Sequence, residues 1–258
     1  MTMTVRRVLL GIAAATLMAP SLAEAQITRV AGSDSRQAVT VHLGAFFPNG
    51  SQEIDSRGIE VCKRNSRTDG DVLCANKESL RFDLEEFNGF VGGAEYSFAL
   101  TDYIELGADV SFYSKTALSE YWDFVNDDGS LIEQDLKLKI VPVTAMVRFV
   151  PFGRRAKVQP FVGIGASFIN WRYSEEGEFI DFDEGGLVFP AEFEADGTEI
   201  APVILGGFRF LAADAFTIGG EFRWQKVSGD TGGIAEGFLG DKIDLGGWTT
   251  NFSFGFRF

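Results

Sequence analysis

Charged residues recur at alternate positions in several short segments of the sequence. Side chains at alternate positions share one face of a β-strand, so these charges would line one polar face of a sheet. Charges enclosed by a narrow barrel must pair, because an unpartnered buried charge costs several kcal/mol. We therefore predict an interior ion-pair network, with a narrow gated channel for small ions as the alternative. Its members are Glu95, Glu105, Asp109, Arg209, Glu221, Arg223 and Arg257, with Lys137 and Lys139 nearer the loop side.

His42 is the only histidine, and it lies on the polar face of the first alternating segment. A histidine beside a serine and an acid could perform acyl transfer. His42-Leu43-Gly44 offers no serine at strand spacing, however, and Thr40 is a weak substitute. We favour an interior hydrogen bond for His42 and predict no catalytic, cofactor-binding or metal-binding residue.

Cys62 and Cys74 are the only cysteines and have eleven residues between them. An even number of cysteines in an exported protein predicts a disulfide. In the chain-entropy model, a disulfide that closes such a short loop stabilises the folded protein by about 3 kcal/mol. A metal site is not favoured, because no third ligand of a suitable type is close.

The segment from Glu175 to Glu199 holds ten acidic residues and no lysine or arginine. Four phenylalanines are interspersed, namely Phe179, Phe182, Phe189 and Phe193. The simplest interpretation is a solvated acidic loop. Clustered carboxylates are also ligands for Ca²⁺ or Mg²⁺, so divalent cations at 175–199 stay an alternative. Acidic residues mixed with exposed aromatics could equally form a contact surface for a partner.

Eight alternating segments would position these residues. The last, Trp248 to Phe258, alternates without error, which predicts a β-strand. About ten tilted residues are enough for a strand to cross a bilayer. Near Ile140-Val141, beside Pro142, the alternation breaks phase, which predicts a bulge. The expected strands are 38–48, 87–100, 103–114, 135–150, 157–172, 199–210, 216–227 and 246–258.

The connections between these segments alternate between long and short. Bacterial outer-membrane barrels have long loops on one side and tight turns on the other, and the short connections here are 101–102, 151–156 and 211–215. Aromatic residues at strand ends suit two membrane interfaces. Those expected there are Trp171, Trp224 and Trp248 toward the long loops and Phe149, Phe152, Phe210 and Phe216 toward the turns. At the second turn, the cations expected to meet inner-leaflet phosphates are Arg148, Arg154, Arg155 and Lys157.

The N-terminus predicts export. Arg6 and Arg7 precede an apolar stretch at 8–19, and Ala23-Glu24-Ala25 supplies a cleavage pattern. We expect a signal peptide at 1–25, a short periplasmic segment at 26–37 and the barrel at 38–258. The net charge of −14 argues against nucleic-acid binding, which uses basic patches.

A soluble eight-stranded barrel, such as a lipocalin-type carrier, would show the same period with its apolar side chains inward. Three features favour the membrane instead. Glycine and small polar residues share the polar face with single charges, aromatics mark strand ends, and long loops lie on one side only.

The segments F-S-F-G-F-R-F (252–258), V-G-G-A-E-Y (91–96) and F-V-G-I-G-A-S-F (161–168) carry a resemblance over nearly the whole expected barrel. With the turn asymmetry, the chain resembles the small outer-membrane β-barrel family, which includes the OmpA-type transmembrane domain and OmpX-like barrels. The resemblance implies that Phe254, Phe256 and Phe258 form the signal for the outer-membrane assembly machinery.

We therefore predict an all-β fold, an eight-stranded antiparallel up-and-down transmembrane β-barrel with four long extracellular loops. The expected location is the outer membrane of a Gram-negative bacterium. The expected role is structural or surface-interacting, without catalysis or cofactor, with a porin-like channel as the first alternative and a lipid A-modifying enzyme as the second. Expected partners are outer-membrane lipid, lipopolysaccharide and the assembly machinery, and the expected state is a monomer.

Overall fold

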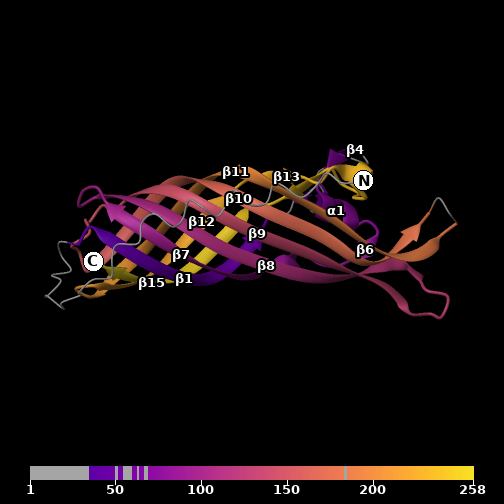
Figure 1. Cartoon of the computed structure of the whole chain (residues 1–258), viewed down its shortest axis with the longest axis horizontal. Helices are drawn as coiled ribbons and strands as arrows, with labels where there is room; N and C mark the ends of the chain where they lie inside the picture. The colour runs from indigo at the N-terminus through magenta and orange to yellow at the C-terminus, as the bar shows by residue number, and fades with distance from the viewer. Residues whose placement is uncertain (1–34, 50–51, 55–59, 63, 67–68, 183–184) are drawn as a thin grey trace, which may run out of the picture. The chain divides into compact units, whose positions relative to one another are not determined.

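Eight antiparallel strands form a closed ring, as the alternating segments predict. In the computed structural model, each strand pairs with the next along the chain, and the last pairs with the first (Figure 1). The ring strands are β1 (Gln37–Pro48), β7 (Gly89–Ala99), β8 (Ile104–Val125), β9 (Leu131–Phe149), β10 (Val158–Asp181), β11 (Leu187–Ala213), β12 (Phe216–Gln225) and β15 (Gly247–Arg257).

The structure describes residues 35–49, 52–54, 60–62, 64–66, 69–182 and 185–258. All of them belong to one compact unit, Ala31–Phe258. The expected signal peptide and most of the expected N-terminal segment lie outside these residues, so the boundaries at 25 and 37 stay predictions.

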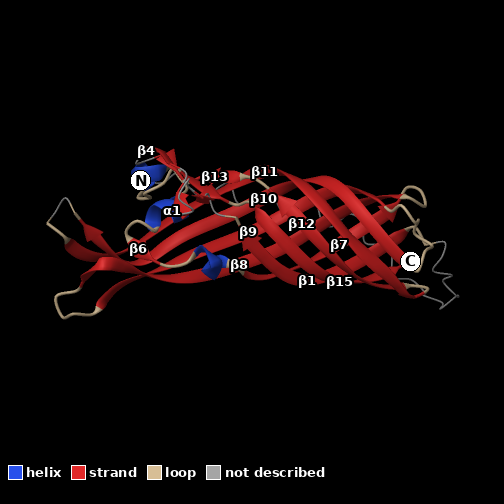
Figure 2. Ribbon diagram, turned by 180° about the vertical axis from the view of Figure 1, so that it is seen from behind, coloured by secondary structure: helices blue, strands red, loops and turns tan. Residues whose placement is uncertain are grey.

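Short elements occupy two of the long connections, and Figure 2 shows helical turns beside the ring at the end opposite the C-terminus. Between β1 and β7 lie β2 (Gln52–Ile54), β3 (Glu60–Cys62), β4 (Arg64–Ser66), β5 (Asp69–Gly70), α1 (Val72–Asn76), β6 (Leu80–Arg81) and the 3₁₀ turn η1 (Leu84–Phe87). Between β12 and β15 lie β13 (Ser228–Asp230), the 3₁₀ turn η2 (Gly233–Glu236) and β14 (Lys242–Asp244). We call this the cap end of the barrel and the opposite end the turn end.

Four of the ring strands are longer than the sequence pattern predicts. β10 and β11 pair without a break as far as Asp181↔Leu187, and β8 and β9 extend to a turn at 126–130. Two of the four long connections, including the acidic segment 175–199, are therefore extended strand hairpins. Charged side chains there alternate along an extended hairpin, which a search for alternating apolar residues misses.

β9 alternates from end to end. Its pairing with β10 keeps one register over its whole length, and its even-numbered residues are the ones turned inward. The predicted bulge near Ile140-Val141 is therefore wrong. The sequence pattern breaks there because the apolar residues move to the other face, while the pleat continues.

The apolar face changes sides along the long strands. On the turn-end side of Pro142, Arg148 is buried inside the ring and Val147 is exposed outside. On the cap-end side, Leu138 is buried inside and Lys139 is exposed outside. Lys137 also faces outward, so the prediction that these two lysines lie on the interior face is wrong.

The same change occurs in β10 between Phe168, which is exposed, and Ile169, which is buried. Its cause is the medium outside the wall. Where lipid surrounds the strands, apolar side chains face outward, and where water surrounds them, apolar side chains collect inside. The change therefore marks where the long strands leave the bilayer.

Exposed apolar side chains cover the outside of the turn-end part of the ring. On β15, Phe252, Phe254 and Phe256 are 51%, 55% and 43% exposed, so the terminal phenylalanines point away from the barrel axis. A soluble carrier would bury such residues, so that alternative does not fit. Among the described residues, no helix has the length and apolar character to span a bilayer.

Six of the seven aromatic residues expected at the interfaces lie on the outer wall or its turns. Trp248 is exposed, with its ring centroid 6.5 Å from that of Trp224. The exposed phenylalanines near the turn end are Phe149, Phe152, Phe210 and Phe216. Trp171 is instead buried inside the ring, so its predicted interfacial place is wrong.

Twenty buried apolar side chains fill the cap end, and we call this cluster the apolar cap. It is built by the extended strands together with residues of α1, η1 and β14. Its members are Phe46, Val72, Leu73, Leu80, Phe82, Phe87, Val91, Tyr113, Ala117, Leu136, Leu138, Ile140, Ile169, Trp171, Tyr173, Ala195, Ala201, Phe238, Ile243 and Leu245.

Asp71 joins the two capped connections to each other. Its Oδ1 accepts hydrogen bonds from the backbone N–H of Leu73, at 2.9 Å, and of Cys74, at 3.3 Å, which caps the start of α1. Its Oδ2 accepts from the backbone N–H of Asp244 at 2.8 Å. One carboxylate therefore holds α1 against β14 above the ring.

Candidate functional site

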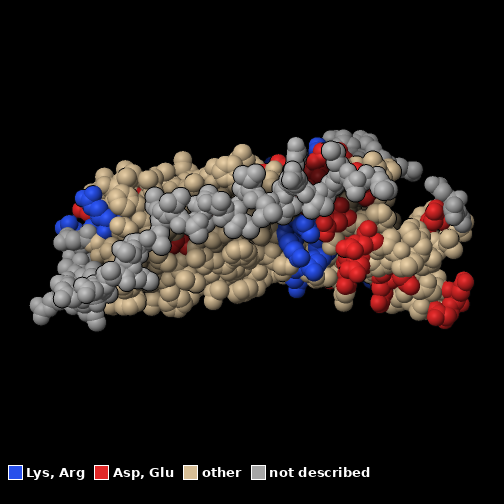
Figure 3. Space-filling model, in the orientation of Figure 1, with Lys and Arg blue, Asp and Glu red and all other residues tan. Residues whose placement is uncertain are grey.

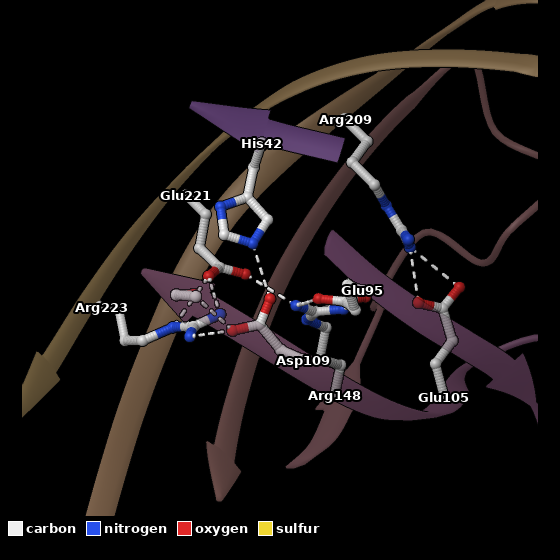
Figure 4. A network of polar contacts seen from close by, with 9 residues as sticks. His42, Glu95, Glu105, Asp109, Arg148, Arg209, Glu221 and Arg223 are labelled. Atoms are coloured by element: carbon white, nitrogen blue, oxygen red, sulfur yellow. Dashed lines mark hydrogen bonds and ion pairs between the residues drawn. The ribbon is translucent and has the colours of Figure 1, made fainter. Parts of the chain in front are cut away.

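Arg148 lies at the centre of the polar interior. Its guanidinium donates to both carboxylate oxygens of Glu95, and its Nη2 lies 2.8 Å from Glu221 Oε2 (Figure 4). The three residues come from β9, β7 and β12, so their contacts link strands across the ring. A guanidinium held by two carboxylates is a strong, geometrically specific arrangement.

Arg223 extends this network toward the cap end. Its Nη1 lies 2.7 Å from Asp109 Oδ1, and its Nη2 lies 2.9 Å from Glu221 Oε1. Asp109 also contacts His42, with 2.6 Å between Oδ2 and Nε2, and accepts from Ser111 Oγ at 2.9 Å. Asp109 is therefore fully engaged by three side chains.

A second part of the network lies nearer the turn end. Arg209 Nη2 is 2.8 and 2.7 Å from the two carboxylate oxygens of Glu105. Arg257 donates to Gln159 Oε1 and to the backbone carbonyl of Arg154. The aromatic ring of Phe161 joins the two parts, with its centroid 5.2 Å from Arg148 Cζ and 5.3 Å from Arg209 Cζ.

The seven charged residues that we assigned to the interior are all buried. With Arg148 they make four arginines and four carboxylates, so the formal charges of the arginines and acids cancel. A cavity beside the cap-end part, lined by Ser111 and Arg223, holds about 20 Å³, and another beside Arg257 holds about 20 Å³. Each has room for about one water molecule, so at these two places the side chains fill the interior.

Arg148 and Arg154 differ from the prediction that they meet membrane phosphates. Arg148 points inward, and Arg154 is buried, with its Nε 3.2 Å from Asp102 Oδ1 and its guanidinium donating to the Ser35 carbonyl. Arg155 and Lys157 are exposed at the turn. Strict alternation along β9 places Arg148 inside the ring. The bulge predicted near Ile140-Val141 hides this placement in the sequence.

His42 is held in a position that does not suit acyl transfer. In a serine–histidine–acid arrangement, the imidazole lies between the acid and the hydroxyl. Here Asp109 lies between His42 and Ser111, and His42 Nδ1 is buried without a hydrogen-bond partner among the described residues. The imidazole ring packs on Gly93, where an added Cβ would lie 2.7 Å from His42 Cε1.

A second polar cluster lies within the apolar cap, on the part of β10 beyond the bilayer. Asn76 Nδ2 donates to Glu175 Oε1 at 2.6 Å, and Tyr173 Oη donates to the same oxygen at 2.9 Å. Burial raises the pKa of Glu175 above its ordinary value of 4.5, against the opposing effect of these two hydrogen bonds. The sequence alone does not indicate this cluster, because Glu175 lies in a run of acidic residues that is typical of a solvated loop.

Glu175 should make the stability of the cap depend on pH. Its pKa is raised on folding. Between the unfolded and the folded pKa values, Glu175 is therefore protonated in the folded protein and ionised in the unfolded chain. Stability is then greatest below the unfolded pKa and falls as the pH rises toward the folded pKa. We expect Glu175→Gln to remove this fall, since glutamine keeps the acceptor and does not ionise. Hydrogen exchange of the α1 amides from pH 4 upward (about the unfolded pKa) measures the effect.

Glu176→Gln is the matched control, because Glu176 is the exposed neighbour of Glu175. It should keep the pH dependence of the unaltered protein. An identical pH dependence in the Glu175→Gln variant and the unaltered protein would contradict a buried, titrating Glu175.

Cys74 is buried in α1 and disulfide-bonded. Cys62, the other cysteine of the sequence, ends β3, where only the backbone is described. The predicted pairing of the two therefore stays a prediction.

The acidic segment 175–199 does not converge on one point. Glu192, Glu194 and Asp196 are exposed along β11, whereas Glu175 is buried. Among the described residues, no three His, Cys, Asp or Glu side chains lie close enough to hold a metal ion. Residues 183–184 lie outside the described part.

A scan of protein-family models and a search of curated proteins found no match. Among solved structures, the chain is similar to the outer membrane protein OprG from Pseudomonas aeruginosa, with a TM-score of 0.51 and 11% identity over 87% of this chain and 96% of that one. It is also similar to Neisserial surface protein A, with a TM-score of 0.41 and 13% identity over 86% of this chain and 95% of that one.

At such low identity, the likeness to OprG describes the fold alone. The closed ring of eight strands agrees with it. By fold, this chain is a closed, eight-stranded antiparallel β-barrel similar to that of the outer membrane protein OprG.

Proposed function

We propose that this chain is a structural or surface-interaction protein whose barrel conducts no ions and performs no catalysis. The observation that carries the proposal is that two barriers to ions follow one another along the barrel axis, the ion-pair network and the apolar cap. The balanced ion-pair network fills the turn-end part, and the apolar cap closes the cap end.

The channel alternative requires a polar path through both barriers. An ion passing Arg148 would have to separate it from Glu95 and Glu221, and breaking a buried pair costs several kcal/mol. It would then have to cross the apolar cap, whose buried apolar side chains do not replace its hydration shell. The arrangement therefore favours a closed barrel over a pore.

The enzyme alternative requires an activated nucleophile. The only histidine is engaged by Asp109, and Ser111 bonds to that acid and not to the imidazole. In this arrangement Asp109 fixes the imidazole of His42, but the Ser111 hydroxyl does not hydrogen-bond to the imidazole and so cannot transfer a proton to it. This supports a non-catalytic interior.

The exposed surfaces are where such a protein would act. Beyond the bilayer, the outward side chains on the extensions of β8 to β11 are mostly polar, with Leu118 and Trp122 of β8 among the exposed apolar exceptions. At the other end, Phe254, Phe256 and Phe258 are exposed on the outside of the last strand, which leaves them accessible to the assembly machinery during insertion. Both roles are part of the proposal.

Planar bilayer recording with the full chain tests the closed barrel. We expect no discrete conductance steps at any voltage, because neither barrier offers an ion path. Heat-modifiable mobility on gels and protection from protease in the same vesicles establish that the protein has inserted. Reproducible steps from inserted protein would contradict the proposal and favour the channel.

A further inference from the structure

Three cations lie together on the outside of the wall, just beyond the bilayer. Lys137 and Lys139 face outward from β9, and Arg172 faces outward from β10. We call them the basic patch. Figure 3 shows Lys and Arg atoms gathered between the uncharged wall and an acidic group on the same face of the molecule.

Strand register brings the three side chains within reach of one anion. Lys139 lies directly opposite Arg172 in the β9–β10 pair, and such neighbours on adjacent strands are about 5 Å apart. Lys137 is the next outward residue along β9, about 7 Å further. A group the size of a phosphate can therefore contact two or three of them at once.

The neighbouring outward residues show where the basic patch lies relative to the bilayer. Toward the turn end, the next outward residues are Val141 on β9 and Asn170 on β10, followed by the apolar pair Val143 and Phe168. Lipid headgroups lie at the end of such an apolar belt. Lysine stems can also lie along apolar surface while the ammonium reaches the headgroup level.

The protein does not balance the charges of the two lysines, whereas Arg172 lies opposite Asp196 in the β10–β11 pair. Neither Lys137 nor Lys139 makes an ion pair or hydrogen bond within the described part of the chain, and Arg172 has one exposed contact, Glu194 Oε2 at 3.3 Å. Like charges directly opposite each other on adjacent strands are destabilising. An anion bound between Lys139 and Arg172 would remove that repulsion.

We propose that the basic patch binds the phosphate groups of lipid A in the outer leaflet. This rests on the proposed function in one respect, because a surface-interaction role requires the cap end to lie outside the cell. Arginine and lysine both bind phosphate, arginine through paired N–H groups and lysine as a point charge. The ligand is thus the anionic headgroup of a lipid that surrounds the barrel.

A long soluble polyanion fits the surface less well. Immediately beyond the patch, Asp135 and Glu176 lie opposite each other, and Glu133 and Glu120 follow in the β8–β9 pair. These carboxylates would repel a sulfated or phosphorylated chain that ran toward the cap end. A compact headgroup phosphate between Lys137 and Lys139 meets these cations without meeting this acidic row, and Glu194 and Asp196 of β11 lie on the far side of Arg172.

Binding of lipid A to the full chain folded in detergent tests the proposal, with fluorescence-labelled lipid A as the probe. The variant is Lys137→Gln/Lys139→Gln, and the control is Arg155→Gln/Lys157→Gln. Both remove two positive charges, but the control residues lie at the opposite end of the barrel. We expect about tenfold weaker binding for the variant, equivalent to about 1.4 kcal/mol, and no change for the control.

Several outcomes would overturn the proposal. They are equal weakening in variant and control, unchanged binding in the variant, or equal affinity of the unaltered protein for lipid A and dephosphorylated lipid A. Loss of binding to a sulfated polysaccharide, with lipid A binding intact, would assign the patch to a soluble polyanion instead. Conductance of the same preparations is measured separately, so failure of the closed barrel and failure of the lipid site can be told apart.

Discussion

Replacing Arg148 with alanine is expected to lower the free energy of unfolding by about 3–5 kcal/mol. The side chain neutralises Glu95 and makes one of the two ion pairs of Glu221 in the barrel interior. Removing it leaves a buried carboxylate without a cation, and that uncompensated charge is the largest part of the loss. Urea unfolding of protein folded in lipid vesicles, followed by tryptophan fluorescence, measures the effect.

Arg155→Ala is the control, because its side chain is 61% exposed at the turn end. It should change stability by less than about 0.5 kcal/mol. Adding Glu95→Ala to Arg148→Ala should recover part of the loss, since the orphaned carboxylate is then gone. A loss in Arg148→Ala as small as that in the control would show that the network is not held by this residue.

Trp171→Ala is expected to have the second large effect, a loss of about 3–5 kcal/mol confined to the cap. The protein backbone lies close against the buried indole on two sides. A Cβ added to Gly229 would lie 2.4 Å from the ring, and one added to Gly197 would lie 3.1 Å from its Nε1. Removing the ring leaves a cavity that the extended strands cannot close, because their pairing holds them apart.

Hydrogen exchange distinguishes loss of the cap from loss of the barrel. In Trp171→Ala, the amides of α1 should exchange faster, while those of β12 and β15 keep their protection. Leu118→Ala is the control, because Leu118 is 72% exposed on the outer face of β8 and should leave both regions unchanged. Unchanged exchange of α1 in Trp171→Ala would mean that the ring does not support the cap.

The sequence was informative about the ring because period two is a local property of the strand. Most of the strands show their pleat within their own residues, and β15 shows which of its faces carries the phenylalanines. The same reasoning assigned seven charged residues to one face, and all seven are buried. It went wrong at Pro142, where a change of solvent outside the wall was taken for a change of pleat.

Pairing across the interior was beyond the sequence for a different reason. Arg148 and Glu221 are separated by 73 residues, and Asn76 and Glu175 by 99. Such contacts depend on where the ring closes and on which connection folds over it. Glu175 looked solvated because nothing near it in sequence indicates that α1 covers it.

Alternation along the chain was therefore enough to determine the number of strands, their order and the outward direction of the apolar wall. The tertiary structure alone decided how far β8 to β11 extend, which acid each arginine meets, and that an apolar cap closes one end. The physical reason is that a pleat is set by neighbouring residues, whereas burial depends on what lies across the barrel and on which solvent lies outside it.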